Sequence, residues 1–529
     1  MAVALAAADT YVVVLALTDM MTGVGLSVDA LQKATPIVSG FLLGYVAVLP
    51  LIGRIADLVA RQRVLVACLA MFVVGSAVTA LAVELPVLVT GRVLQGVGGG
   101  GLVPATLALV ADLWPPGRRG MPLGVVGAVQ ELGSVLGPVF GAAVLAVSGW
   151  RTIFWLNAVA GLVLAAVVTV LGGRRLARPR GIPLVVGALA LVTGALALDA
   201  PDRLATDVTL GVPFVPFGSS TSRLTTPIGV VALVLLVLWL AVTVPRAWSL
   251  LRRADLPGAL LLGGALGCVV LTFAASDPQR QVVGAAGWLL LPLAAVALAG
   301  YLWRHRTAAS PLVARGVVRS RAGVALVVSA LAGVVLVAVV VDVPVLARLT
   351  YTSSETVAAF VLVRFLVAVP LGALLGGWSL RRLGDGLVAL TGLGVAGAGL
   401  LLMSRWGEGT LAAPSATAVL LAVGLGVGLA VAPVNNAALA AAPIGAQGTA
   451  SALVVMCRMV GMVVGLSLLT AIGLHRYYAT VAALPDQGDT HALVSAGVVQ
   501  VQTVFAGAAV AALLGAAASA GLGLRRLDD

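Results

Sequence analysis

Five ionisable residues lie inside stretches of sequence that should be buried in a lipid bilayer. Three are arginines, Arg92, Arg364 and Arg458, and two are carboxylates, Asp9 and Glu131. The sequence around them is almost entirely aliphatic, with a mean hydropathy of +1.13 and only 10% charged residues. A charge at the centre of a bilayer costs about 2.5–3.5 kcal/mol on insertion scales. Such residues indicate ion pairing, proton movement or substrate contact, and together they predict a transporter.

Three of these residues should lie at a similar depth in the membrane. At a rise of 1.5 Å per residue, Asp9, Glu131 and Arg458 lie about 10, 15 and 16 Å from the same membrane face. We therefore predict that Arg458 pairs with Asp9 or Glu131. A protonatable acid that exchanges its arginine partner between conformations couples proton movement to transport. The alternative is a static ion pair that only fixes helix packing.

The other intramembrane charges have less specific interpretations. We expect Arg92 to take part in gating rather than in substrate binding. Arg364 either pairs with Glu131 or extends its guanidinium towards the membrane surface. Three further carboxylates lie near the ends of apolar stretches and are either functional groups or caps at the membrane interface: Asp19, Asp112 and Asp342.

Membrane-spanning helices must hold these residues. A helix needs about 20 apolar residues to cross a bilayer, and the sequence contains sixteen such stretches. They begin near Val3, Pro36, Val64, Pro86, Met121, Thr152, Pro183, Ile228, Leu256, Gly287, Ala322, Glu355, Gly386, Ser415, Gln447 and Val499. The runs are continuous, whereas a membrane barrel would show alternating segments of roughly ten residues. The predicted fold class is an all-α polytopic membrane protein with no soluble domain.

The basic residues predict the orientation. The net charge is +12. When both termini are assigned to the cytoplasm, 21 of the 32 Lys and Arg fall in or beside cytoplasmic loops and eight in outer loops, which is the positive-inside bias. Examples are the runs Arg174–Arg180 and Arg304–Arg321. We therefore expect a multi-pass protein of the cell membrane and no nucleic-acid partner.

Several cofactor classes have no support in the sequence. The three cysteines all lie in apolar stretches and form no disulfide or metal-binding pattern. The phosphate-binding loop of nucleotide hydrolases is missing from the sequence, so we do not expect ATP to drive transport. We expect no metal and no cofactor, with the proton as the coupling ion, and no enzymatic activity.

The spans divide into three groups. We predict a six-helix half over 1–172, four further helices over 173–318 and a second six-helix half over 319–529. The loop that starts at Gly53 faintly resembles the one that starts at Gly377, and repeated halves around a central site are typical of secondary transporters. We expect the outer loops 199–227 and 475–498 to be solvated connectors, with a small hairpin as an alternative for 199–227.

Four short motifs follow one another in the first half. They are the loop Gly53-Arg54-Ile-Ala-Asp57-Leu-Val-Ala60-Arg61-Gln-Arg63, the segment Arg92-Val-Leu-Gln95-Gly96, the glycine series Gly133, Gly137, Pro138 and Gly141, and the segment Trp150-Arg151-Thr-Ile-Phe154-Trp155-Leu-Asn157. Their order and positions resemble the major facilitator superfamily, in its drug:proton antiporter branch. The resemblance implies two six-helix halves, here with four additional helices between them.

The resemblance also implies gating roles for these motifs. Asp57 would cap the N-terminus of a facing helix and pair with an arginine, which would close the cytoplasmic side. Ala60 replaces the second glycine of the family loop. Glycines spaced four apart let two helices approach closely, and Pro138 would kink its helix at a gate. The residues assigned to gating are Gly53, Arg54, Asp57, Arg61, Arg92, Gln95, Gly96, Gly133, Gly137, Pro138 and Gly141.

The segments around Asp9, Asp112, Glu131, Asp342 and Arg458 look like the mycobacterial lipid-exporting subfamily. That resemblance implies proton-coupled export of triacylglycerol or glycolipids by alternating access, a periplasmic LprG-type lipoprotein as partner, and a link to drug tolerance. We expect a monomer. Only 25 of 529 residues are Phe, Trp or Tyr, which suits acyl chains better than flat aromatic cations. Proton-coupled export of amphiphilic or cationic drugs is the alternative, and a membrane scaffold or receptor is a third reading.

Overall fold

The part of the chain that the structure describes consists of long helices joined by connections. The computed structural model describes residues 1–27, 31–172, 181–201, 204, 207, 211–218, 222–274, 287–318, 321–352, 354–443, 445–485 and 489–524. Its long helices are α1 (Ala2–Gly23), α2 (Leu31–Leu58), α3 (Arg61–Leu81), α4 (Leu85–Leu113), α5 (Gly120–Val147), α6 (Trp150–Gly172), α7 (Ile182–Asp199), α9 (Pro227–Arg253), α10 (Leu256–Ala274), α11 (Gly287–Thr307), α12 (Arg321–Thr350), α13 (Glu355–Ser379), α14 (Asp385–Met403), α15 (Pro414–Ala441), α16 (Gln447–Ala482) and α17 (Thr490–Ser519).

The fold class predicted from the sequence is confirmed. Fifteen of these helices are long and apolar enough to cross a membrane, and α1 adds a sixteenth helix of 22 residues. Helices are the expected solution because every backbone N–H and C=O within a bilayer must bond inside its own segment or barrel. The described residues contain no strand.

One predicted loop is wrong. The stretch 475–498 is mostly helical, because α16 continues to Ala482 and α17 already begins at Thr490. The Asp489 side chain caps α17 by accepting bonds from the backbone N–H groups of His491 and Ala492, which explains why a polar segment is helical there. Hydropathy detects the crossing of the membrane, whereas these helices extend beyond it.

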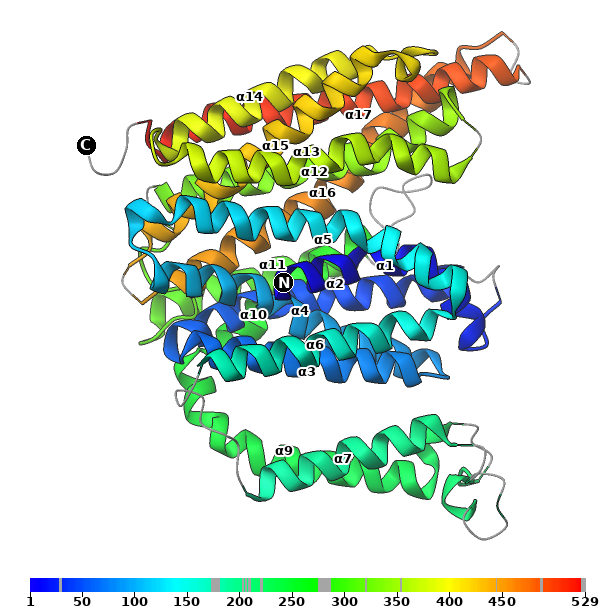
Figure 1. The fold of residues 1–529 in the computed structure, drawn as a ribbon, viewed down its shortest axis with the longest axis vertical. Coiled ribbons are helices and arrows are strands. Elements are labelled where there is room, and N and C mark those ends of the chain that lie inside the picture. The colour runs from blue at the N-terminus through cyan, green and yellow to red at the C-terminus, as the bar shows by residue number, and fades with distance from the viewer. Residues whose placement is uncertain are drawn as a thin grey trace.

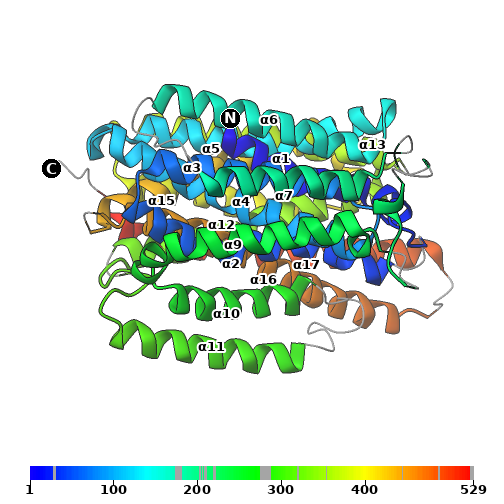
Figure 2. The same ribbon diagram turned by 90° about the horizontal axis from the view of Figure 1, so that it is seen from below.

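The helices pack as two groups with a third set beside them. Helices α1–α6 pack on one another, as do α12–α17, and the two groups meet where α5 packs on α13 and α2 on α16 (Figure 1). Figure 2 shows α10 and α11 stacked below α2 and α16, and α10 packs on both α2 and α16. The pair α7 and α9 lies at one side of the molecule (Figure 1), where it packs mainly on itself and also contacts α3, α2 and α10. The division of the chain at 172 and 318 stays a prediction.

Glycines let the first group pack closely. A Cβ on Gly133 or Gly137 would meet the backbone of Ala4 or Ala8 on α1, so the predicted close approach of the α5 glycines is made to α1. The run 98–101 on α4 likewise faces α2 and α3, where a Cβ on Gly100 would meet the backbone of Tyr45. Both stretches therefore serve helix packing.

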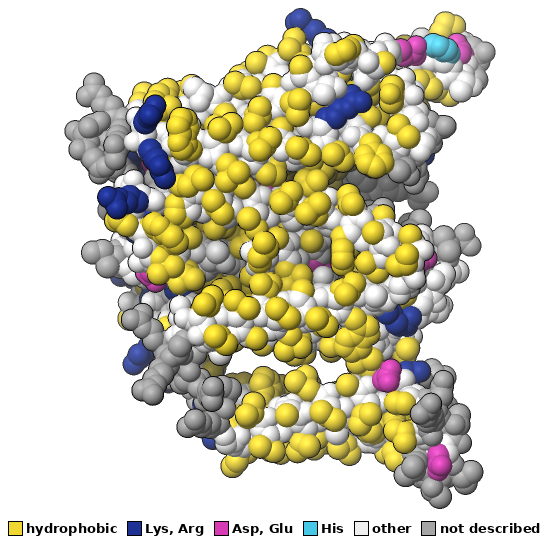
Figure 3. All heavy atoms as spheres, in the orientation of Figure 1, with side chains coloured by type: hydrophobic (Ala, Val, Ile, Leu, Met, Phe, Trp, Pro, Cys, Tyr) yellow, Lys and Arg dark blue, Asp and Glu magenta, His cyan; other side chains and the backbone are white. Residues whose placement is uncertain are grey.

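Basic residues gather at one end of the bundle. This end, called the basic end below, carries the connections 59–60, 114–119, 254–255, 308–318 and 380–384. Several arginines are visible along the corresponding left edge in Figure 3. The predicted basic run 174–180 lies outside the described residues.

The outer loop 199–227 is only partly described. Its described residues include two short 3-10 turns, Val212–Phe214 and Arg223–Thr225. The backbone N–H of Arg223 donates to the Glu84 carboxylate at 2.7 Å, and its guanidinium bonds the carbonyl of Leu198. These bonds tie the α7–α9 pair to the start of α4 at the end opposite the basic end.

Candidate functional site

An ion pair inside the first group joins α1 to α4. Arg92 Nη1 lies 2.7 Å from Asp9 Oδ2, and the two side chains are 1% and 0% exposed. The guanidinium also lies 4.5 Å from the centre of the Phe41 ring. Because both charges are excluded from solvent, each depends on the other and on neighbouring polar groups.

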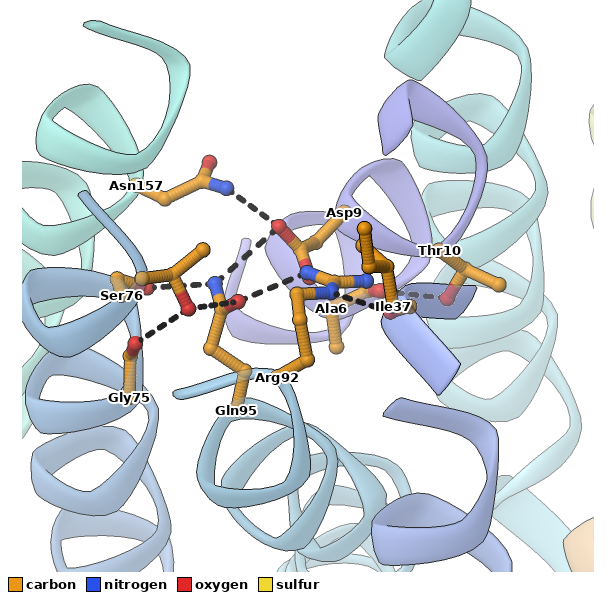
Figure 4. Close-up of polar contacts among 10 residues, drawn as sticks. Ala6, Asp9, Thr10, Ile37, Gly75, Ser76, Arg92, Gln95 and Asn157 are labelled. Atoms are coloured by element: carbon orange, nitrogen blue, oxygen red, sulfur yellow. Dashed lines mark hydrogen bonds and ion pairs between the residues drawn. The ribbon is translucent and has the colours of Figure 1, made fainter. Parts of the chain in front are cut away.

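Polar side chains from two further helices complete this cluster (Figure 4). Asn157 on α6 donates to Asp9 Oδ1 at 2.7 Å. Gln95 accepts from Arg92 at 2.8 Å and donates to Ser76 on α3 at 2.8 Å. The cluster therefore locks α1, α3, α4 and α6 together.

A second ion pair joins the two helix groups. Arg458 Nη1 on α16 lies 3.2 Å from Glu131 Oε1 on α5, and the side chains are 13% and 8% exposed. The contact predicted from helix depth is therefore present with Glu131, whereas Asp9 has Arg92 as its partner. Glu131 and Arg458 are the charged residues that line the small cavity between the groups.

This cavity has a volume of about 40 Å³, which is room for about three water molecules. Its remaining polar lining comes from Gln130, Ser329 and Asn435, and the Oδ1 atom of Asn435 is buried without a partner among the described residues. The apolar lining is aliphatic: Val103, Leu107, Val126, Ala332, Leu336, Val427, Ala430, Val431, Val434, Val454 and Val455. In this conformation the cavity is too small for a lipid.

At the basic end, Asp57 of α2 caps α16 of the other helix group. Its carboxylate accepts bonds from Gly448 N at 2.6 Å, from Thr449 N at 2.9 Å and from the Thr449 hydroxyl at 2.6 Å. The N-terminus of a helix favours a carboxylate because its first N–H groups lack partners and carry the positive end of the helix dipole. Gly53 brings α2 into backbone contact with Gly448 at the same place.

Asp57 forms no ion pair with an arginine among the described residues, although the charge of Arg61 is near enough to act on it. The Arg61 guanidinium binds Asp112 and the carbonyl of Ala108, because the last turn of α4 presents free carbonyl oxygens and a carboxylate. Arg61 also donates to Gln447 on α16 at 3.2 Å. In the same cluster, Arg119 donates to the carbonyl of Ala111. Burial lowers the pKa of Arg119, the positive charge of Arg61 lowers it further, and the negative charge of Asp112 raises it. Asp112 is thus an ion-pair partner.

For two more residues the contacts exclude one of the alternatives that the sequence left open. Arg364 does not pair with Glu131; its guanidinium donates to the Thr417 hydroxyl at 3.0 Å and to the carbonyl of Leu411 at 3.4 Å. These groups lie at the start of α15, within reach of the flexible side chain. Asp342 is 5% exposed and its Oδ2 has no partner among the described residues, so it is no interfacial cap. Asp19 is exposed near the end of α1.

The sequence analysis named Gln95 and Asn157 only as members of motifs, without assigning them to Asp9, and it missed Ser76. Asn157 is the one amide in the apolar run of α6, and that isolation was an available signal. Ser76 and Thr79 lie three residues apart on α3, which places them on one helix face. Arg54, assigned to gating, donates to Ser310 Oγ at 3.1 Å, and its gating role stays a prediction. Groups of His, Cys, Asp or Glu able to hold a metal ion are not found among the described residues.

Comparison with known proteins identifies the family. The sequence profile of the Major Facilitator Superfamily matches residues 1–196. A "Triacylglyceride transporter" of Mycobacteroides abscessus is 35% identical over 497 residues, which cover 92% of this chain and 83% of that protein. The chain belongs to the Major Facilitator Superfamily. The "Triacylglyceride transporter" of Mycobacterium tuberculosis is also 35% identical, over 500 residues that cover 92% of this chain and 83% of that protein.

Solved structures agree on the fold. The proton:xylose symporter XylE has a TM-score of 0.53 at 14% identity, with 94% of this chain and 92% of that chain covered. The human organic anion transporter MFSD10 has a TM-score of 0.52 at 15% identity, with 98% of this chain and 97% of that chain covered. The family resemblance read from the motifs is confirmed. The relatives of this superfamily member are named as transporters, so the chain is a membrane transporter and no enzyme.

Proposed function

We propose that the protein exports lipids of the triacylglycerol or glycolipid type across the cell membrane in exchange for protons, by alternating access. The observation that carries this proposal is the Glu131–Arg458 pair, which bridges the two helix groups beside the central cavity. The names of the relatives from Mycobacteroides abscessus and Mycobacterium tuberculosis support the lipid substrate.

We base proton coupling on two contacts of α16 with the first helix group. The Glu131–Arg458 pair and the Asp57 cap both join α16 to the first helix group. Protonating Glu131 removes its attraction to Arg458 and weakens this connection. A proton taken up from the opposite end would then favour opening of the basic end, where it is released as the lipid enters. The substrate and the proton thus move in opposite directions.

The cavity lining supports a greasy substrate. Its apolar residues are valine, leucine and alanine, and none of the described lining residues is aromatic. Branched aliphatic side chains pack well around acyl chains, whereas flat aromatic cations bind best against aromatic rings. Export of cationic drugs is the second candidate, and the Glu131 carboxylate in the cavity is the group that favours it.

Transport in liposomes tests the proposal. Purified protein is reconstituted, a pH gradient is imposed, and the transfer of a fluorescent triacylglycerol to the acidic side is followed. The proposal expects transfer that stops when a protonophore collapses the gradient. A fluorescent lipophilic cation is run in parallel. If the cation moves with the gradient and the triacylglycerol does not, the second candidate replaces the first.

Orientation is part of the proposal. We infer that the basic end faces the cytoplasm, because basic connections are retained on that side. The opposite end would then deliver lipid to a periplasmic LprG-type lipoprotein. Single cysteines at Val215 and Pro485, in a background without the three native cysteines, should react with an impermeant reagent from outside. Reaction of either cysteine only from the cytoplasmic side contradicts this orientation.

A further inference from the structure

A hollow of about 520 Å³ lies at the basic end, away from the two ion pairs described above. It is formed by the last turn of α11 and by residues 308–318, called the α11–α12 link here. Its lining residues are His305, Val313, Ala314, Arg315, Gly316 and Val318.

Three hydrogen bonds hold the link in place. The backbone N–H of Leu312 donates to the Asp255 carboxylate at 3.0 Å. Ser310 donates to the carbonyl of Arg253 at 3.2 Å and accepts from Arg54 of α2 at 3.1 Å. Asp255 is buried and also pairs with Arg304 at 2.6 Å. The hollow is therefore bounded by a fixed backbone that joins α2, the α9–α10 junction and α11.

The surroundings of the hollow are strongly basic. Between positions 246 and 318, the described residues include six arginines and a single carboxylate, Asp255. Asp255 is already neutralised by Arg304. The exposed Arg315 bonds the carbonyls of Arg306 and Ala308 through Nη2, at 2.9 Å each. Its Nε and Nη1 have no partner among the described residues, so they can donate to an anion in the hollow.

The position of the hollow matches the level of lipid headgroups. Helices α9 and α11 end at Arg253 and Thr307, so the hollow lies where membrane helices leave the bilayer. Leu302 and Leu298 lie three and seven residues before His305, so they share its face of α11, and they are 50% and 44% exposed. Trp303, on another side of the same turn, is 71% exposed. An exposed tryptophan at a helix end is typical of the membrane interface. A headgroup in the hollow would leave its acyl chains along α11.

We propose that this hollow binds the phosphate headgroup of an anionic membrane lipid, with Arg315 as its main ligand and His305 as a second polar group in the lining. Basic pockets between membrane helices at the cytoplasmic face recognise such headgroups. The bound lipid would tie α11 to the link that leads into α12. This site is separate from the central cavity and does not depend on the transported substrate.

Native mass spectrometry of the full chain tests the proposal without any transport measurement. Binding of phosphatidylglycerol is compared with binding of phosphatidylcholine to the purified protein. We expect phosphatidylglycerol to bind preferentially and Arg315→Gln to weaken this binding about fivefold, since one basic residue near an anionic surface contributes about 1 kcal/mol. Arg315→Lys should retain most of the binding, which separates loss of charge from misfolding. Arg381→Gln, an exposed arginine at the same end, is the matched control and should change nothing.

Three results would overturn this assignment. One is equal binding of phosphatidylcholine and phosphatidylglycerol by the unmodified protein. Another is unchanged binding in a correctly folded Arg315→Gln variant, or equal weakening in the Arg381→Gln control. The third is displacement of phosphatidylglycerol by millimolar inorganic phosphate, which would make the hollow a site for free phosphate.

Discussion

Replacing Arg458 with alanine should strand the Glu131 carboxylate inside the protein. The two side chains are 13% and 8% exposed and lie 3.2 Å apart. Removing one partner of a buried ion pair costs about 3–5 kcal/mol, because the remaining charge is uncompensated. The cavity of about 40 Å³ beside the pair can admit water. We therefore expect the lower end of this range, about 3 kcal/mol.

The double variant Glu131→Gln with Arg458→Ala isolates the contribution of the pair. It removes the stranded charge, so it should regain most of the lost free energy of unfolding, measured at equilibrium in mixed detergent micelles. Arg364→Ala is the control, because among the described residues Arg364 bonds neutral groups, on Thr417 and Leu411. That change should cost about 0.5–1.5 kcal/mol. Simple addition of the two single effects in the double variant would refute the reasoning.

Three further substitutions test other parts of the account. Asp9→Asn should abolish gradient-driven export. It also strands the buried Arg92, so it should destabilise the fold by about 3–5 kcal/mol, and undiminished export by the folded variant would exclude Asp9 from proton coupling. Asp57→Ala removes the cap of α16 and should lower the free energy of unfolding by about 0.5–2 kcal/mol. A reporter cysteine at Val455 should then react several-fold faster with a reagent added from the basic end. An unchanged reaction rate would contradict a gate at Asp57. Gly137→Leu should destabilise the fold by about 1–3 kcal/mol, because the side chain would overpack against α1. Gly149→Ala is the control and should be neutral, since a Cβ there meets nothing. Equal stability of the two variants would contradict this packing.

Hydropathy predicts the membrane helices well because a helix that crosses a bilayer needs about 20 mostly apolar residues in a row. The predicted start near Ala322 is one residue from the observed start of α12 at Arg321. The last helix shows the limit, since Thr490 precedes the predicted Val499 by nine residues. The polar segment between them is helical because Asp489 caps it, and hydropathy does not register a cap.

The sequence predicts how deep the charged residues of the candidate site lie in the membrane, but it predicts less well which of them pair. Counting residues along two helices places Glu131 and Arg458 at one level, and they are indeed in contact. Depth does not fix the rotation of a helix about its axis. Asp9 therefore could not be assigned to Arg92 in advance, since only packing turns it towards α4 and α6. For the same reason the sequence placed Asp342 at an interface, whereas packing buries it.

The central claim is that a proton on Glu131 is exchanged for the exported lipid. The most direct test follows triacylglycerol export and proton uptake together in liposomes that contain the unmodified protein or Glu131→Gln. The amide matches the carboxyl in shape and cannot release a proton. The account predicts that the variant binds lipid but shows neither a response to the pH gradient nor proton uptake. Export by the variant that still follows the gradient and still moves protons would contradict it.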